Sequence, residues 1–581
     1  MLYSFHSIDH QLHNTPFFRS DGISFPYTVR VSFKDARGKV IHEKSYGYLT
    51  LAHIYDTIGQ HDFLDIDDCF VDNISLTACR RYLLMAKNDR ISIKGLSAKD
   101  AFFYSTLKVD FSLADFVGVA NFEGATFVCE EVSFHQSSFS KTGAAFQNTV
   151  YKTGIVDFTR VNYVLGEANF KNAVFSEGVK NFQDSRFLDA NANFVNVDFG
   201  DGDVSFINTH FYNSITDFKV ATFGRGKVDF HFAKFKTGDV SFERVEFGYG
   251  RKDFRTVEFG TGKVTFNRCD FGDGDISFEG ADSTGGRLLF RKSSFGQGEV
   301  CFDIFEGKEA DIFFEQVSFE KGSVSFAGGL FQNLTLTSCL FSDRLDIRVA
   351  AAQAIDLSDS IVRDIVDFRP HDRMQCVGTL DITGLKLLGR IYLDWQQNNA
   401  KMLVYGQRET SFNDKADQFR ILKENFNALG QYDDEDKAYV EYRRCEQKCK
   451  LHRQLKGSLS AKVIAYPRYL WKLLLYDLMG LYATRPSRVF VSMGAVYLLF
   501  SFLYMILISL GIGNINASGG HPDSLSIVSR SLYHSAITFF TIGYGDFYPS
   551  GPIRIVCGIE GFVGVFLMAY FTVAFVRKIL R

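Results

Sequence analysis

The sequence predicts three regions of different fold class: a long all-β, right-handed β-solenoid, a helical linker, and an α-helical domain that crosses a membrane twice. Three observations support this prediction. Phenylalanine recurs at every twelfth position from Phe122 to Phe326, glycine recurs at every twenty-fourth position from Gly154 to Gly322, and two long apolar runs lie near the C-terminus. Fixed periods of this kind indicate stacked repeats, and long apolar runs indicate membrane spans. We expect a small mixed cap domain over residues 1–100, the solenoid over 101–400, the linker over 401–485 and the membrane domain over 486–581.

The N-terminal hundred residues lack the repeat. We expect them to cap the solenoid, because the open end of a β-helix would otherwise invite edge pairing. Met1–His10 contains no apolar signal core, and the ten cysteines of the chain lack paired spacing. We therefore expect the large N-terminal part to remain reduced in the cytosol.

The solenoid repeat has five plus seven residues, because a second aromatic follows most of the periodic phenylalanines after five residues, as Phe127 follows Phe122. A 24-residue coil with four short sides explains why the glycines recur at twice the phenylalanine period. One corner of each coil then requires glycine, because its backbone takes positive φ. The alternative is a flat 12-residue coil, which would have to pack two aromatic rings into a very thin interior. We favour the 24-residue coil with internal phenylalanine ladders, continuing less regularly beyond Phe341 to about Trp395.

A small or β-branched residue stands two places before most of the periodic phenylalanines, as Val204 precedes Phe206. This pattern resembles the pentapeptide-repeat β-helices, in which small and large residues alternate into a four-sided core. The chain departs from that family by using phenylalanine almost throughout and by lengthening two sides per coil, so the resemblance implies fold and not function. Corners such as Gly200–Asp203 resemble calcium-binding turns, but equivalent corners carry basic residues such as Arg225, and we expect no calcium site.

The linker is expected to be helical. Phe419, Leu422 and Phe426 follow helical spacing up to Gly430, after which Asp433 or Asp434 would cap a second helix. Next, Ala461–Tyr482 has the composition of an amphipathic segment at the cytoplasmic membrane surface, with an ordinary packed helix as the alternative.

Two apolar runs are long enough to cross a bilayer. Val489–Ile512 is an uncharged run of 24 residues, which spans about 36 Å as a helix. Ile555–Val576 is interrupted only by Glu560. No span carries arginine at every third position, so we expect no conventional voltage sensor. Basic residues flank the spans and place both termini in the cytoplasm: Arg485 and Arg488 before the first, and Arg577, Lys578 and Arg581 after the second.

The segment between the spans carries the most informative motif. Ser524–Phe540 has the composition of a re-entrant pore helix and leads into Thr-Ile-Gly-Tyr-Gly-Asp at 541–546. Gly543 and Gly545 supply the backbone freedom that lets successive carbonyls point one way. Four copies of such a strand can replace the hydration shell of K⁺. Thr541–Asp546, with Thr538 upstream, resembles the selectivity filter of potassium channels.

This resemblance, together with the order of the regions, implies a homotetrameric potassium-selective channel of the bacterial inner membrane with a cytoplasmic solenoid. K⁺ is then the permeant ion, held by the Thr541 hydroxyl and by the carbonyls of Thr541, Ile542, Gly543 and Tyr544. Membrane lipid is an implied partner, and no organic cofactor is expected. The expected site residues are Thr541, Ile542, Gly543, Tyr544 and Gly545 in the filter, Asp546, Thr538 and Glu560 at the outer mouth and as filter support, and Gly564 and Gly561 as candidate gating hinges.

Two of these residues have competing interpretations. Glu560 either braces the back of the filter by a hydrogen bond to the pore-helix region or reaches water at the interface. Gly564 lies deeper than Gly561 and is the better hinge, but small residues in membrane helices also serve as packing contacts.

Other functions are disfavoured by the sequence. The net charge of −3 gives no reason to expect a nucleic-acid partner. No nucleophile–base constellation or phosphate-binding loop is evident, so we expect no enzyme. A non-selective cation pore is the competing channel function, disfavoured because Thr541 and Tyr544 are both present. A different class of function makes the solenoid a scaffold or ligand-binding module for which the pore is an output, and the sequence names neither its partner nor the gating stimulus.

Overall fold

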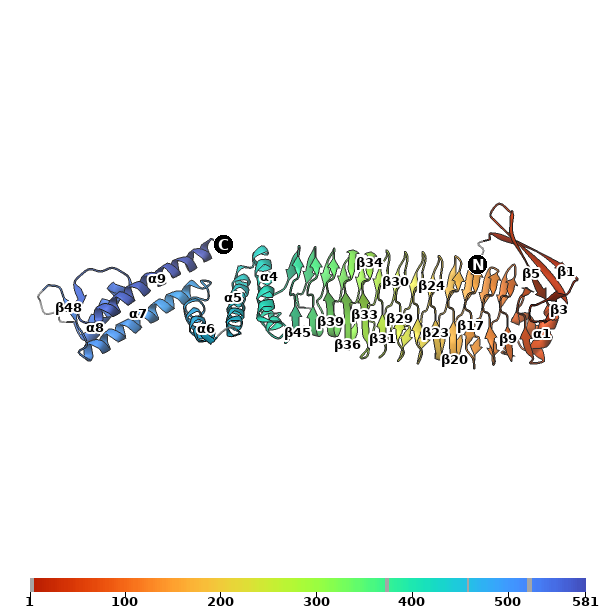
Figure 1. Ribbon diagram of the computed structural model, residues 1–581, viewed down its shortest axis with the longest axis horizontal. Coiled ribbons are helices and arrows are strands. Elements are labelled where there is room, and N and C mark those ends of the chain that lie inside the picture. Colours follow the sequence, from red (N-terminus) through yellow and green to blue (C-terminus); the bar gives the residue numbers. More distant parts are fainter. Residues whose placement is uncertain (1–4, 371–375, 457–458, 520–524, 581) are drawn as a thin grey trace. The chain divides into compact units, whose positions relative to one another are not determined.

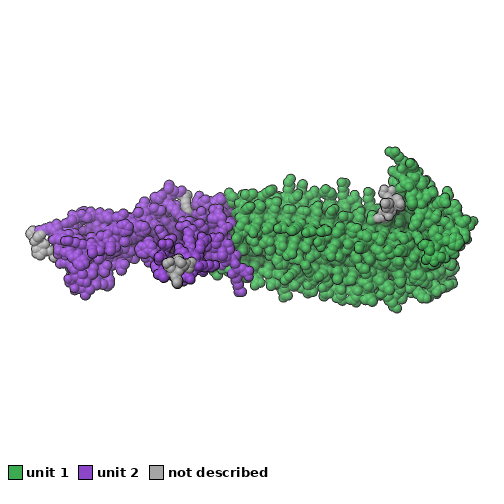
Figure 2. All heavy atoms as spheres, in the orientation of Figure 1, with its two compact units in different colours: residues 1–407 green, residues 408–581 purple. Residues whose placement is uncertain are grey.

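The computed structural model describes residues 5–370, 376–456, 459–519 and 525–580 (Figure 1). The chain divides into two compact units, Met1–Gln407 and Arg408–Arg581 (Figure 2). Among the described residues, the first unit is mainly β and the second is mainly helical.

The first unit begins with an antiparallel sheet of β1 (Ser7–His13), β4 (Tyr27–Lys34) and β5 (Val40–Tyr48). β5 also pairs in parallel with β7 (Cys69–Asp72), which pairs with β10 (Phe102–Tyr104) of the solenoid. The N-terminal strands therefore extend one face of the solenoid and pair an edge that would otherwise be open. Two short helices complete this part, α1 (Leu51–Gly59) and α2 (Leu76–Tyr82).

Parallel strand pairing of the solenoid type also occurs before residue 101. β6 (Phe63–Asp65) pairs in parallel with β9 (Gly95–Ser97), and β8 (Ile91–Ile93) pairs in parallel with β12 (Ala114–Phe116). The inward residues of these first rungs are aliphatic, such as Leu64. The periodic phenylalanine signal is absent there, so the sequence repeat does not mark these rungs.

Each coil of the regular region has 24 residues. One coil consists of β15 (Glu131–Ser133), β16 (Ser138–Phe139), β17 (Ala144–Ala145) and β18 (Val150–Lys152). β19 (Ile155–Asp157) then starts the next coil, with Val156 paired to Val132 of β15. The 24-residue coil is confirmed and the 12-residue coil is wrong. The ladder of this side runs from β11 (Lys108–Asp110) to β47 (Arg390–Tyr392), as the sequence predicted for the less regular end.

Aromatic ladders fill the interior of the coils. The rings of Phe134 and Phe158 stack with centroids 4.9 Å and planes 2° apart. Phe134 also meets Phe146 edge-on, at 5.3 Å and 82°. Each ring thus stacks within its own column and packs edge-to-face against the next, and both are favoured aromatic geometries. The predicted phenylalanine ladders are confirmed.

The glycine that recurs every 24 residues lies at a corner that no other residue could form without strain. Gly202 has φ of 106°, and a Cβ on it would lie 2.1 Å from the carbonyl oxygen of Gly178 in the preceding coil. Positive φ and close stacking of the corners together require glycine, as predicted. A second type of corner was not predicted. It also takes positive φ, two residues after each core phenylalanine, but it holds diverse residues that include Val220 and Phe232.

Tyr163 interrupts a ladder between Phe139 and Phe187, with ring centroids 5.3 Å and 4.6 Å away. Its side chain is buried, and its hydroxyl has no hydrogen-bond partner among the described residues. Because such a hydroxyl costs about 1–3 kcal/mol, we expect Tyr163→Phe to raise the free energy of unfolding by roughly that amount. Hydrogen exchange of the solenoid amides in the full chain measures the change. The reverse substitution Phe187→Tyr is the matched control and should destabilise; unchanged or faster exchange in Tyr163→Phe would contradict this expectation.

Two lysines replace inward valines in one column of the core. Lys180 pairs with Val156 of the preceding coil, and Lys252 pairs with Val228. Both side chains are buried, and Nζ of Lys252 donates to the carbonyl oxygen of Gly248 at 2.9 Å. Burial lowers the pKa of both ammonium groups from 10.5 to about 8.

These lysines make the stability of the solenoid depend on pH. Between pH 8 and pH 10.5 the unfolded chain still binds the two protons that the folded chain has lost, so the free energy of unfolding rises with pH across this window. We expect Lys252→Val to stabilise the solenoid below pH 8 by up to about 3 kcal/mol and to remove its share of the rise. Urea unfolding at pH 7 and pH 10, followed by aromatic circular dichroism, measures both effects. Substitution of the exposed Lys263 by valine is the control, and a rise with pH as large in Lys252→Val as in the natural protein would refute the assignment.

The helical elements follow the last coils. A helical hairpin is formed by α4 and α5. Ser411 and Asp414 form a capping box at the start of α4, and Gly430 with φ of 71° separates the two helices. The expected cap of the second helix by Asp433 or Asp434 is wrong: Gln431 is the N-cap residue and the acids lie in the first turn. The helices are α3 (Ala400–Tyr405) in the first unit, and α4 (Phe412–Ala428), α5 (Tyr432–Leu455), α6 (Leu459–Lys472), the π-helical η1 (Leu473–Leu478), α7 (Pro486–Ser509), α8 (Ile527–Phe539) and α9 (Ile553–Ile579) in the second.

Two helices, α7 and α9, are long and apolar enough to cross a membrane. They have 24 and 27 residues, and their most apolar windows have mean hydropathies of 2.2 and 2.0. α7 begins three residues before the predicted Val489, at Pro486, a residue suited to the first turn of a helix. Ser524, the predicted start of the pore-helix region, and Arg581 lie outside the described residues.

Candidate functional site

Residues 541–546, the predicted filter and called the filter segment below, directly follow the C-terminal end of α8. The N–H of Ile542 donates to the carbonyl oxygen of Ile537 at 2.9 Å, and the N–H of Thr541 to that of Thr538 at 3.1 Å. The negative end of the α8 dipole therefore lies where the filter segment begins. All six residues are exposed in a single chain, and Tyr544 is 71% exposed.

Alternate residues of the filter segment have positive φ. The values are 53° at Thr541, 57° at Gly543 and 75° at Gly545, whereas Ile542 and Tyr544 between them do not adopt positive φ. Nothing lies within 4 Å of a Cβ built on either glycine. The backbone conformation, and not lack of space, is therefore what requires glycine at Gly543 and Gly545. A strand with this alternation can present successive carbonyls to one side.

The far end of the filter segment is tied down on two sides. Tyr533 of α8 donates its hydroxyl to Oδ2 of Asp546 at 2.7 Å. The N–H of Ser518 donates to the Asp546 carbonyl oxygen at 2.8 Å, beside the antiparallel pair of β48 (Ile515–Ala517) and β49 (Phe547–Pro549). Asp546 remains exposed. Sequence reasoning missed Tyr533, because an aromatic residue on a helix gives no sign of which carboxylate it will reach.

Glu560 joins three helices behind the filter segment. Its side chain is buried, and Oε2 accepts a hydrogen bond of 2.6 Å from the Tyr504 hydroxyl of α7. Oε1 accepts a hydrogen bond from the Ser535 hydroxyl of α8. The carboxylate therefore points to the helix that carries the filter and not to solvent. Tyr504 and Ser535 were not predicted, since they are distant in sequence from Glu560 and from each other.

The two glycines of α9 face the C-terminal end of α8. A Cβ on Gly564 would lie 2.1 Å from the carbonyl oxygen of Phe539, and one on Gly561 would lie 4.0 Å from that of Thr538. α9 runs without interruption through both. In this conformation Gly564 is a close packing contact, and a hinge at either glycine stays a prediction. Thr538 also contacts α9, with its hydroxyl 3.7 Å from the Cys557 sulfur.

Comparison with known proteins finds a family match for the C-terminal part of the chain. Residues 492–581 match the family model described as an ion channel. The match contains the filter segment, α8, α9 and most of α7. No curated protein and no solved structure matches the chain. The solenoid and the linker lie outside the ion-channel match, so their role has to be argued from their own contacts.

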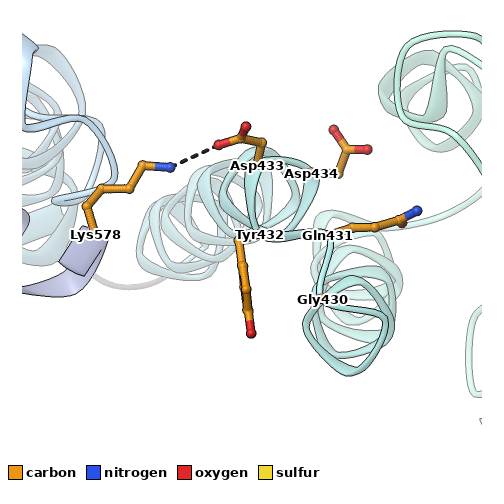
Figure 3. A pocket seen from close by; sticks show the side chains of 6 residues that line it. All are labelled: Gly430, Gln431, Tyr432, Asp433, Asp434 and Lys578. Atoms are coloured by element: carbon orange, nitrogen blue, oxygen red, sulfur yellow. Dashed lines mark hydrogen bonds and ion pairs between the residues drawn. The ribbon is translucent and has the colours of Figure 1, made fainter. Parts of the chain in front are cut away.

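The linker contacts the C-terminal end of residues 492–581, which are called the ion-channel segment below. Arg577 of α9 donates to Oδ1 of Asp436 at 3.1 Å and lies 4.4 Å from the centre of the Tyr439 ring. Nζ of Lys578 donates to Oδ1 of Asp433 at 2.9 Å (Figure 3). Helix α5 thus meets α9 through residues near its N-terminal end. The contact borders a cavity of about 500 Å³ lined by Gly430, Gln431, Tyr432, Asp433, Asp434 and Lys578 (Figure 3).

The linker also contacts the ion-channel segment at a second point. The N–H of Ala483 donates to the Tyr570 hydroxyl of α9 at 3.0 Å. Arg444 of α5 binds Asp477 of η1 with two hydrogen bonds of 2.8 Å and 2.7 Å. α5 and η1 are therefore joined to each other, and α9 is joined both to α5 and to the turn that follows η1.

Proposed function

We propose that the protein is a potassium-selective channel. The single observation that supports this most is the alternation of positive φ at Thr541, Gly543 and Gly545 in a Thr-Ile-Gly-Tyr-Gly strand between two spanning helices of an ion-channel segment. K⁺ would be held by the Thr541 hydroxyl and by the carbonyls of residues 541–544, which replace its hydration shell. A non-selective cation pore remains the alternative, and a filter with both Thr541 and Tyr544 disfavours it.

The channel is a homotetramer in this proposal. One chain supplies one filter strand, in which Ile542 and Tyr544 are 49% and 71% exposed within that chain. Four copies close the ring around a fourfold axis. We expect the purified protein in lipid nanodiscs to have the mass of four chains and to carry K⁺ out of proteoliposomes. A monomer in lipid would contradict the proposal.

The proposed location is the bacterial inner membrane, with both termini and the solenoid in the cytoplasm. Val489 of α7 and Ala574 of α9 belong to one apolar cluster, so the flanking cations Arg485 and Arg577 lie toward the same side of the membrane. On α6, Val463 and Trp471 are exposed, as a helix in contact with membrane lipid requires.

The solenoid is regulatory in this proposal rather than a passive scaffold. The linker that follows it binds α9, the helix after the filter in the sequence. The bonds are made at Arg577 and at Tyr570. A solenoid that only anchored a partner would not need its linker to hold that helix. The alternative is that the solenoid is the functional part, a scaffold or ligand-binding module for which the pore is an output.

A further inference from the structure

The contact between the first turns of α5 and the last turn of α9 joins opposite charges in a partly shielded place. The side chains of Arg577 and Asp436 are only 22% and 11% exposed, and Glu435 lies 3.7 Å from the same guanidinium. Water screens the bond of Lys578 to Asp433, whose side chain is 87% exposed, but Nζ of Lys578 also lies 3.3 Å from Oδ2 of Asp436. Asp436 pairs with both cations and therefore contributes most of the contact.

Helix dipoles make this contact depend on its carboxylates. The N-terminal end of α5 carries a partial positive charge, which by itself repels Arg577 and Lys578. Asp433, Asp434 and Glu435 occupy the first turn of α5, and Asp436 follows them. Removing the carboxylates would convert attraction between the two helix ends into repulsion.

The same helix reaches α9 by a second route. Arg444 ties α5 to η1 through Asp477, and the turn after η1 binds Tyr570 of α9. Residues 481–483 of this turn have positive φ between 46° and 62°, a conformation that costs about 1–2 kcal/mol per residue for L-amino acids. The turn is therefore strained, and the contacts around it hold it in place.

We propose that the acidic first turns of α5 are a latch that holds the cytoplasmic end of α9 and favours the closed pore. This inference rests on the proposed tetrameric channel. When four α9 helices converge on the fourfold axis, four pairs of Arg577 and Lys578 approach one another, and their repulsion opposes closure. Asp436 and Glu435 neutralise that charge and attach each α9 to the linker. Movement of α5 away from α9 releases the charge and favours opening.

The test uses the full chain in planar bilayers. We expect Asp436→Asn combined with Glu435→Gln to raise the open probability about fivefold or more, a usual size for coupling between sites. Arg577→Gln should not raise it, because it removes the repulsion together with the attraction. The charge swap of Asp436→Arg with Arg577→Asp should return the open probability toward that of the natural protein. Asp417→Asn is the matched control: it breaks an ion pair with Arg420 on α4 that does not involve α9, and should change nothing.

A second measurement does not depend on conduction. Hydrogen exchange of the last two turns of α9 should become faster in the Asp436→Asn, Glu435→Gln variant and return to the natural rate in the charge swap. Unchanged exchange and unchanged open probability, or a lower open probability, would overturn the latch. If the channel instead proved unselective while exchange responded as expected, the proposed selectivity would fail and the latch would stand.

Discussion

Gly543→Ala is expected to abolish the discrimination between K⁺ and Na⁺ while leaving membrane insertion intact. Gly543 has φ of 57°, where an L-residue costs about 1–2 kcal/mol. In a tetramer the strain is repeated four times around one ring of carbonyls. Relief of the strain turns those carbonyls away from the ion, so the permeability ratio from reversal potentials should fall to near one.

Gly511 provides the matched control for this substitution. It has φ of 69°, and a Cβ added to it would likewise have nothing within 4 Å, but it follows the end of α7 outside the filter segment. Gly511→Ala should therefore add similar strain without changing selectivity. A Gly543→Ala channel that stays potassium-selective would contradict the role given to this glycine, as would equal losses in the two variants.

Glu560→Ala is expected to destabilise the ion-channel segment strongly. The substitution leaves the buried Tyr504 hydroxyl without its acceptor, at about 1–3 kcal/mol. The Ser535 hydroxyl loses its bond to Glu560 and keeps one of 3.2 Å to the Tyr497 carbonyl oxygen. We expect a loss of roughly 1–3 kcal/mol and a lower temperature of tetramer dissociation in nanodiscs. The hydroxyls come from α7 and α8, so the loss should loosen the helix that carries the filter.

A double-mutant cycle separates this network from a general effect of changing α9. Tyr504→Phe and Glu560→Ala should be non-additive, because they remove the same hydrogen bond. Thr572→Ala is the control, since its hydroxyl donates only to the Met568 carbonyl oxygen of its own helix. If Glu560→Ala and Thr572→Ala had equal effects, the network would have no special role.

The solenoid could be predicted because its sequence repeats what its structure repeats. A ring stacked on its counterpart one coil away, such as Phe134 on Phe158, requires the same residue at a fixed spacing. The corners at Val220 and Phe232 could not be predicted, because positive φ occurs there without glycine. The first coils could not be recognised from a repeat, since aliphatic residues such as Leu64 fill their interior and do not recur at a fixed spacing.

The filter segment was evident from its local motif, but its supports were not. Thr541–Asp546 is continuous in sequence, whereas Glu560, Tyr504 and Ser535 meet only because three helices pack together. The same holds for Arg577 and Asp436, which are 141 residues apart. Composition indicates that such groups need partners, and only the packing of the helices identifies the partners.

The reversal potential of the natural protein under bi-ionic conditions tests the central claim most directly. With K⁺ on one side of a planar bilayer and Na⁺ on the other, carbonyl rings that replace the hydration shell of K⁺ predict a current that reverses far from zero, on the side set by K⁺. A reversal potential near zero would mean that Na⁺ passes as readily as K⁺, and would contradict the account of the filter.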